Sequence, residues 1–341
     1  MNPSHLSRRD FLKLSGLGLA GLFAPPLMLE LEDPFASLQG RVTARTIWLH
    51  EKPSVEAGKV KLLQQDAILD IANTALSDDT TAHNRVWYQI GTEGYAYSGN
   101  IQPVRTAFNT PQTDIQKQGL LAEVSVPFTD ALLAPHVDAK FIYRIYYETT
   151  HWVKKAVTDG EGRVWYQIRD DKWNRLYYVR AEHLRILTPG ELAPISPDIP
   201  EHEKKIVVRL GQQITIAYEY DRPVFIVPVA TGGVLRVGTY TTPQGNFITS
   251  YKRPSRRMAA GDIASTGFDL PGVPWVQYIT TSGIAFHGTY WHNDFGRPRS
   301  HGCINLSSSA AKWLYRWTSP QVAFERELVY GRAGTRVEIV A

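Results

Sequence analysis

The sequence has few cysteines and methionines and no long apolar run, and these shortages restrict what the chain can be. One cysteine in 341 residues excludes an intramolecular disulfide framework and any zinc motif built on paired cysteines. No apolar run reaches the roughly 20 residues that a transmembrane helix needs. The net charge is only +4, and no lysine or arginine block of the nucleic-acid-binding type occurs after the N-terminus, so we expect no nucleic-acid partner.

The sequence is instead rich in aromatic and β-forming residues. Hydrophobic residues make up 43% and charged residues 21% of the chain, as in soluble globular proteins. There are 17 tyrosines and 9 tryptophans, which suit β-rich cores and binding grooves. The length predicts two or three domains.

The N-terminus has the pattern of an export signal. Residues 7–13 read SRRDFLK, and residues 14–29 follow without a charge. A paired arginine before a short, glycine-rich apolar run resembles a twin-arginine signal. We therefore expect residues 1–29 to direct the protein to the cell envelope, in the periplasm or cell wall. If the segment is not cleaved, it would remain as a membrane anchor.

A repeat follows the signal. The string RVWYQI occurs at residues 85–90 and again at residues 163–168, an offset of 78 residues. Its apolar side chains alternate, which is typical of β-strands. We predict two small β-barrels, at residues 40–105 and 121–189, which resemble bacterial SH3-like domains. Such modules either bind cell-wall glycan or peptide, or act as spacers packed on an enzyme domain.

A proline-rich stretch marks the last domain boundary. Residues 189–203 contain four prolines, which exclude a helix or a central strand, so we predict a linker at 190–203. In the final domain, residues 204–341, we expect an irregular stretch at 251–274 and one helix capped by Ser307 or Ser308. The strands are expected at 206–210, 213–220, 223–230, 246–250, 275–281 and 283–288.

The chemical centre of this domain is the segment SHGCIN, residues 300–305. If the segment is extended, His301 and Cys303 project from the same face with Cα atoms roughly 6–7 Å apart. A neighbouring histidine lowers a thiol pKa and generates the thiolate nucleophile. Gly302 leaves room for a substrate, and the backbone N–H groups of Gly302 and Cys303 are candidates for an oxyanion hole.

The spacing around this segment resembles a known family. His287 is followed by twelve residues and then by the SHGCIN segment, as in the L,D-transpeptidase (YkuD) catalytic domain. The upstream ATGG and TTPQG segments, at residues 230–233 and 241–245, also resemble that family. The resemblance covers residues 204–341. It implies a mainly β, β-sandwich-like domain with little helix that needs no metal and no organic cofactor.

The resemblance also implies a reaction and a substrate. Cys303 would attack the carbonyl between positions three and four of a peptidoglycan stem peptide, release D-Ala and hold the remainder as a thioester. An amine of a second stem would then complete a 3→3 cross-link. His301 would act as the base, and His287 and Gly302 would complete the catalytic site. The residues expected to brace the motif or contact the substrate are Ser300, Asn305, Tyr278, Trp291 and Gly288, with Trp275 and His292 as further wall residues.

The stretch at 251–274 is a candidate lid over this site. It carries Arg253, Arg256 and Arg257, which would face the carboxylates of anionic stem peptides.

There are four alternatives to the hypothesis of a transpeptidase. A zinc site could use His287, His292, His301 and Cys303, but their spacing is irregular. A papain-like endopeptidase of the NlpC/P60 type needs histidines after its cysteine, and none follows Cys303. The same acyl-enzyme would also serve an L,D-carboxypeptidase or the attachment of wall proteins. Finally, the chain could be a non-catalytic cell-wall-binding protein that acts through its repeats.

Overall fold

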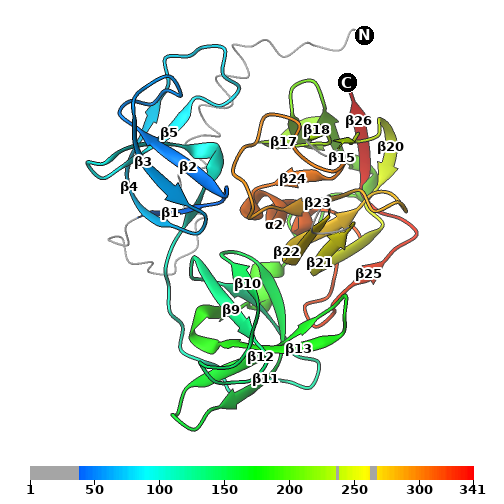
Figure 1. Ribbon diagram of the computed structural model, residues 1–341. Helices are drawn as coiled ribbons and strands as arrows, with labels where there is room; N and C mark the ends of the chain where they lie inside the picture. The colour runs from blue at the N-terminus through cyan, green and yellow to red at the C-terminus, as the bar shows by residue number, and fades with distance from the viewer. Residues whose placement is uncertain (1–37, 236–237, 262–266) are drawn as a thin grey trace. The chain divides into compact units, whose positions relative to one another are not determined.

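The computed structural model describes residues 38–235, 238–261 and 267–341, so the predicted signal at residues 1–29 lies outside the described residues. The prediction of a mainly β protein is confirmed, since the described residues form several β-sheets and a single α-helix (Figure 1). No helix in this part of the chain is long and apolar enough to cross a membrane.

The first module is a seven-stranded antiparallel sheet over residues 39–104. The strand order is β3-β2-β6-β5-β4-β1-β7. The first RVWYQI string supplies β5, where Trp87 and Ile90 are buried in the core. The strands are β1 (Gln39–Val42), β2 (Thr46–His50), β3 (Lys59–Gln64), β4 (Ile68–Leu76), β5 (Val86–Ile90), β6 (Gly94–Tyr97) and β7 (Ile101–Val104), with a 3-10 turn, η1 (Ser98–Asn100), before β7.

The second module, residues 120–186, repeats this sheet. Its order β10-β9-β13-β12-β11-β8-β14 is the first order with every label raised by seven. We predicted two small β-barrels, and in both sheets the outermost strands are not paired with each other, so neither described sheet is closed. The strands are β8 (Leu120–Val124), β9 (Phe128–Leu132), β10 (Phe141–Tyr146), β11 (Thr150–Thr158), β12 (Val164–Asp170), β13 (Arg175–Arg180) and β14 (Leu184–Ile186), with η2 (Ala181–His183) before β14.

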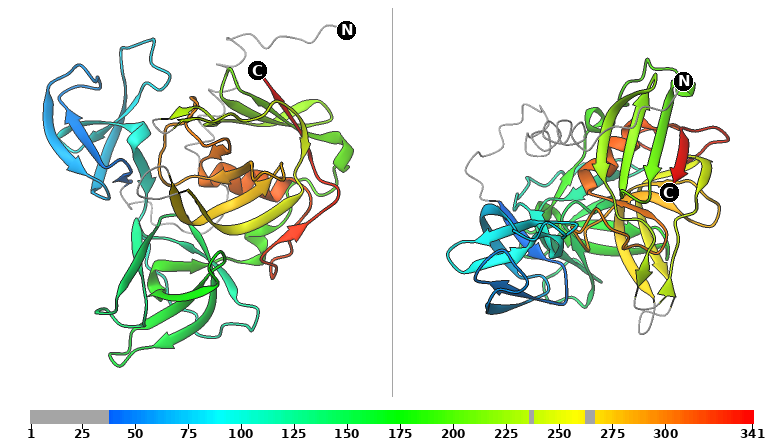
Figure 2. Two further views of the ribbon diagram at one scale, coloured as in Figure 1. Left: turned by 45° about the vertical axis from the view of Figure 1, so that its right-hand side comes forward. Right: turned by 90° about the horizontal axis from the view of Figure 1, so that it is seen from above.

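The C-terminal region contains two five-stranded sheets that enclose one core. One sheet has the order β17-β16-β15-β26-β20 and the other β24-β23-β22-β21-β25. Alternating apolar residues of both sheets meet helix α2 in this core, and Figure 2 shows the helix between the sheets. The strands are β15 (Lys204–Arg209), β16 (Ile214–Glu219), β17 (Arg222–Pro228), β20 (Gly245–Ile248), β21 (Tyr251–Ala260), β22 (Phe268–Tyr278), β23 (Ala285–Gly288), β24 (Ile304–Leu306), β25 (Val329–Tyr330) and β26 (Arg336–Val340), with a small pair β18 (Val234–Leu235) and β19 (Gly238–Thr239).

Helix α2 (Ser308–Trp317) forms where the sequence predicts it. Ser307 is the N-cap, and its hydroxyl accepts a hydrogen bond from the Ala310 N–H at 3.3 Å. Leu314 and Trp317 are buried on the face that the apolar spacing indicates. The helix starts two residues after β24 ends, so it directly supports the strand that follows the SHGCIN segment.

The stretch at 251–274 is not irregular. Strands β21 and β22 pair along most of its length as a long hairpin. The prolines and basic residues suggested a loop, but the hairpin has a register shift between Arg256 and Met258, and its arginines pair with aspartates. Long-range ion pairs of this kind leave no local signal in the sequence.

The predicted linker is ordered and packed. Two 3-10 turns, η3 (Pro189–Leu192) and η4 (Glu201–Glu203), lie at its ends. Leu192 and Ile195 pack against the C-terminal core. Glu191 forms ion pairs with Arg185 of the second module, at 2.7 Å, and with Lys312 of α2, at 3.3 Å.

Candidate active site

The SHGCIN segment lies at the edge of the second five-stranded sheet, beside the strand that carries His287. Strands β23 and β24 are parallel, with His287 opposite Asn305. The ATGG segment holds the motif from its other side: Ala230 and Asn305 exchange two backbone hydrogen bonds of 3.0 Å, and the Ser300 N–H donates to the Thr231 carbonyl at 2.9 Å. The motif is therefore fixed by backbone pairing on both sides.

Residues 301–303 form a bend rather than the extended segment that we predicted. Gly302 has a φ of +111°, a conformation that L-amino acids with a side chain rarely adopt. Its N–H donates to Ser300 Oγ at 3.1 Å, and its carbonyl accepts a hydrogen bond from Thr242 Oγ1 at 2.7 Å. The Gly302 N–H is thus already paired and is not a free oxyanion-hole donor. Of the two predicted donors, only that of Cys303 remains a candidate.

Cys303 lies at the end of this bend in a largely apolar environment. It packs against a buried cluster that includes Ala285, as do Tyr278 and Trp291, and its thiol donates to the Gly283 carbonyl at an S···O distance of 3.7 Å. Burial raises the pKa of the Cys303 thiol to about 11, although a backbone hydrogen bond from Ala285 opposes the shift. The resting nucleophile is therefore a neutral thiol at neutral pH.

His301 points away from this apolar environment. Its side chain is exposed, and its ring packs edge-on against Tyr240, with centroids 4.4 Å apart, and against Phe268 of the hairpin at 5.3 Å. Partial burial lowers the pKa of His301. Within the described part of the chain no hydrogen bond joins His301 to Cys303. The bend at Gly302 explains why the predicted pair is not formed in the resting protein.

His287 is the more constrained of the two histidines. It is 2% exposed, and its Nδ1 lies 3.0 Å from the Gly288 carbonyl. That bond requires the proton on Nδ1, so Nε2 is an acceptor. Burial lowers the pKa of His287 to about 4, which keeps the ring neutral above that pH. Because His287 lies opposite Asn305 on the neighbouring strand, it belongs to the same edge of the sheet as Cys303.

The loop at residues 288–299, which joins the two parts of the site, is held by polar contacts. Asp294 is completely buried and binds Arg299 at 2.6 Å and also Arg297. The Asp294 N–H donates to His292 Nδ1 at 3.2 Å, and His292 Nε2 lies 3.0 Å from the side-chain amide of Asn305. Burial lowers the pKa of His292 to about 3. This chain of contacts connects the middle of the loop to β24.

The residues that we predicted to line the substrate groove lie in different environments. Trp291 lies beside His287, with ring centroids 5.6 Å apart, and packs near Cys303, as does Tyr278. Gly288 is buried where an added Cβ would lie 2.7 Å from Pro274, so its role is close packing. Trp275 is 1% exposed in the core between the sheets, so the prediction that it lines a groove is wrong.

The hairpin arginines are already paired. Arg253 and Arg256 bind Asp171 of the second module at 3.0 and 2.6 Å, and Arg257 binds Asp170 and, at 2.6 Å, Asp269. The expectation that these arginines face a substrate is therefore wrong for this structure. The four residues considered for a zinc site do not form one among the described residues, where no group of three or more metal-ligating side chains occurs.

Two residues of the site escaped the sequence analysis. Thr242, in the TTPQG segment, is buried and links the Gly232 N–H, at 2.9 Å, to the Gly302 carbonyl. The resemblance indicated its segment but gave it no role. Asp294 was not singled out, because two of its partners, His83 and Tyr97, lie about 200 residues away in the sequence.

A comparison with protein families confirms the resemblance for part of the chain. Residues 203–339 match the family described as the L,D-transpeptidase catalytic domain, YkuD. No curated protein sequence matches the chain.

Several solved structures resemble the chain at low identity. An L,D-transpeptidase from Mycobacterium smegmatis is 23% identical over 41% of this chain and 59% of that chain, with a TM-score of 0.33. One from Xylanimonas cellulosilytica is 25% identical over 40% of this chain and 60% of that chain, with a TM-score of 0.29. L,D-transpeptidase 3 from Mycobacterium tuberculosis is 20% identical over 41% and 60%, with a TM-score of 0.32. The chain thus spans less than two thirds of each of these proteins.

Proposed function

We propose, from the premise that residues 203–339 are an L,D-transpeptidase catalytic domain, that this protein forms 3→3 cross-links between peptidoglycan stem peptides. One observation carries the proposal: the only cysteine of the chain lies inside the matched domain, at the end of the bend that contains His301 and next to the strand that pairs with that of His287. A thiol nucleophile and a base that can reach it are the minimum that acyl transfer through a thioester requires, and this domain offers one thiol and two candidate histidines.

The proposed reaction has two stages. In the first, a histidine takes the Cys303 proton as sulfur attacks the carbonyl carbon between stem positions three and four. The C–N bond then breaks, D-Ala leaves as the amine after taking a proton, and a thioester remains. In the second, the amine of another stem attacks the thioester, the C–S bond breaks, and the sulfur regains a proton. The protein supplies the nucleophile, the base and the Cys303 N–H as a candidate backbone donor, and no step uses a metal or a cofactor.

The thiol requires a base at the moment of attack. Because the pKa of Cys303 is about 11, the resting site holds little thiolate, and the proton must move as the substrate binds. His301 is the base that the sequence predicts, and rotation of its exposed ring would bring it toward the thiol. His287 is the second candidate, since its neutral ring presents Nε2 as an acceptor.

The proposal is tested by product analysis. The purified protein and its Cys303→Ala variant are incubated with a disaccharide-tetrapeptide, and the products are read by mass spectrometry. We expect a cross-linked dimer that has lost one D-Ala, and background levels with the variant. A tripeptide alone would identify a carboxypeptidase. If neither protein gave any product, the proposed activity would be rejected in favour of another acceptor or of wall binding.

A further inference from the structure

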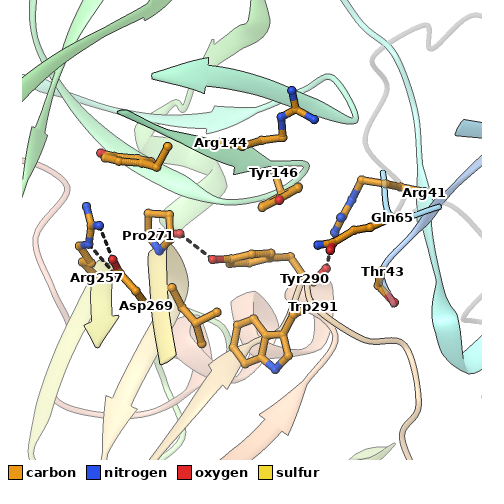
Figure 3. A pocket seen from close by; sticks show the side chains of 12 residues that line it. Arg41, Thr43, Gln65, Arg144, Tyr146, Arg257, Asp269, Pro271, Tyr290 and Trp291 are labelled. Carbon is orange, nitrogen blue, oxygen red and sulfur yellow. Dashed lines mark hydrogen bonds and ion pairs between the residues drawn. The ribbon is translucent and has the colours of Figure 1, made fainter. Parts of the chain in front are cut away.

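The first module contacts the loop that joins the two parts of the active site. Loop residue Asp294 accepts hydrogen bonds at 2.8 Å from His83 Nε2 and from the Tyr97 hydroxyl, and both of these residues belong to the first module. The Asn293 N–H donates to the Gly99 carbonyl at 3.0 Å. Figure 3 shows a further contact, in which the Arg41 guanidinium reaches the backbone carbonyl of Tyr290.

These contacts provide hydrogen bonds to a buried carboxylate, that of Asp294. Burial alone would raise the pKa of Asp294, but the hydrogen bonds from His83 and Tyr97 and the charges of Arg297 and Arg299 lower it below its usual value. A buried carboxylate that lost these donors would be left partly unsatisfied. The first module therefore contributes directly to the stability of the loop.

Further hydrogen bonds and ring contacts connect the loop with the catalytic residues. From Asp294 the chain of hydrogen bonds runs through His292 to Asn305, two residues after Cys303. Tyr290 and Trp291, at the start of the loop, meet edge-on with ring centroids 5.0 Å apart, and Trp291 packs beside His287. Fixing residues 290–294 thus fixes the surroundings of both His287 and the motif.

The repeat provides an independent observation. The two modules share one strand order, so each residue of the first has a counterpart in the second. Gly99 is the middle residue of η1, and its counterpart in η2 is Glu182. A Cβ at position 99 would lie 2.7 Å from Asp294 Oδ1, so the close approach of the loop requires glycine there. The second module, which carries a glutamate at this position, contacts the loop elsewhere, through Tyr146 stacked on Tyr290 with ring centroids 5.2 Å apart.

The other two contact residues differ in the same way. Tyr97 lies opposite Trp87, and its counterpart opposite Trp165 is Arg180, which pairs with Glu182 of its own module. His83, two residues before the first RVWYQI string, corresponds to Glu161 before the second. The two glutamates could not replace their counterparts, because they would repel the Asp294 carboxylate. Arg180 is a donor, but in the second module it pairs with Glu182.

From these observations we infer that the first module is a positioning element for the active site, which holds the loop at residues 290–294 through His83, Tyr97 and Gly99. The inference gives the module an intramolecular role beyond spacing or wall binding. Its effect on turnover rests on the proposed function, whereas its effect on the loop does not.

Two variants of the full chain test the inference. Tyr97→Phe removes one hydroxyl donor to Asp294, and Gly99→Glu introduces the residue of the second module. The control is Tyr178→Phe, which removes a hydroxyl that accepts from Gln167 at 2.7 Å within the second module. Hydrogen–deuterium exchange of the peptide covering residues 289–299 reports on the loop. The initial rate of dimer formation gives kcat and KM.

We expect both first-module variants to raise exchange in this peptide about tenfold, because one hydrogen bond to a charged group is lost or displaced. Exchange in the strands of the first module should not change. The kcat should fall by a similar factor with little change in KM, and the control should match the wild-type protein. Unchanged exchange in both variants, or an equal increase in the control, would overturn the inference.

Faster exchange with an unchanged kcat would refute the positioning role, because the loop would then be held without effect on catalysis. A protein without transpeptidase activity would reject the proposed function, and the exchange measurement would still decide whether the first module holds the loop.

Discussion

At the scale of single residues, the two histidines of the site have different surroundings and therefore different expected roles. His287 is buried with a fixed tautomer, whereas His301 is exposed and makes ring contacts with Tyr240 and Phe268. A general base contributes roughly 10²–10⁴-fold to a rate. We expect the glutamine variant of the true base to lose kcat by that factor.

The variants to compare are His301→Gln and His287→Gln, with kcat and KM measured for dimer formation. Because the sequence analysis assigns the role of base to His301, we expect kcat to fall more in His301→Gln than in His287→Gln. If His287→Gln lost more than 100-fold and His301→Gln less than tenfold, the base would be His287. The thermal stability of each variant shows whether a loss of activity reflects unfolding.

The raised pKa of the Cys303 thiol predicts how the reactivity of this cysteine depends on pH. With a pKa of about 11, Cys303 is almost entirely protonated at pH 7, so only about 1 in 10,000 molecules carries the thiolate. Alkylation by iodoacetamide should therefore rise about tenfold per pH unit from pH 7 to pH 10 in the absence of substrate.

The same titration of His301→Gln is the control, because no hydrogen bond joins the two side chains in the resting protein. The two curves should coincide. A reactive plateau below pH 8 that disappears in the variant would show a thiolate–imidazolium pair and contradict this description of the resting site.

At the scale of elements, the hairpin β21–β22 depends on the second module. Asp171 binds Arg253 and Arg256 and accepts the Arg257 N–H at 2.7 Å, and its side chain is only 11% exposed. Removing one partner of a largely buried ion pair costs about 3–5 kcal/mol, because the other charge stays buried. We expect Asp171→Asn to lower the free energy of unfolding by about this amount, measured in urea.

The matched control is Asp221→Asn. Asp221 pairs with Lys205 at 3.4 Å, but its side chain is 92% exposed. An exposed pair contributes at most about 1 kcal/mol, so this variant should remain close to the wild type. If the two variants had equal stability, the hairpin would not be anchored through Asp171.

The helices and strands also show which parts of the fold could be predicted from the sequence. Alternating apolar residues predicted the strands, and Ser307 with the apolar face after it predicted α2, because these signals lie within a few residues of each other. The hairpin was missed because its arginines find their partners in Asp170 and Asp171, about 85 residues away. The motif identified Cys303, His301 and His287, but the extended geometry assumed for it did not foresee the bend at Gly302.

At the scale of the whole molecule, both repeat modules contact the active-site region, and the loop after His287 also meets the second module where Tyr146 stacks on Tyr290. The first holds the loop that follows His287, and the second holds the hairpin whose Phe268 touches His301. A cavity of about 260 Å³ lies between residues of both modules and the C-terminal domain, beside Tyr290 and Trp291 (Figure 3). Two copies of one fold thus support two flanks of one site.

The single, partly buried cysteine also decides how the whole molecule responds to oxidants. Peroxides attack thiolates far faster than thiols, and susceptibility follows both thiolate character and exposure. With no second cysteine to resolve a sulfenic acid as an intramolecular disulfide, one oxidation event would inactivate the chain. A thiol that stays protonated until a substrate arrives therefore reacts slowly with oxidants in the resting protein, and this protects the only thiol of the chain.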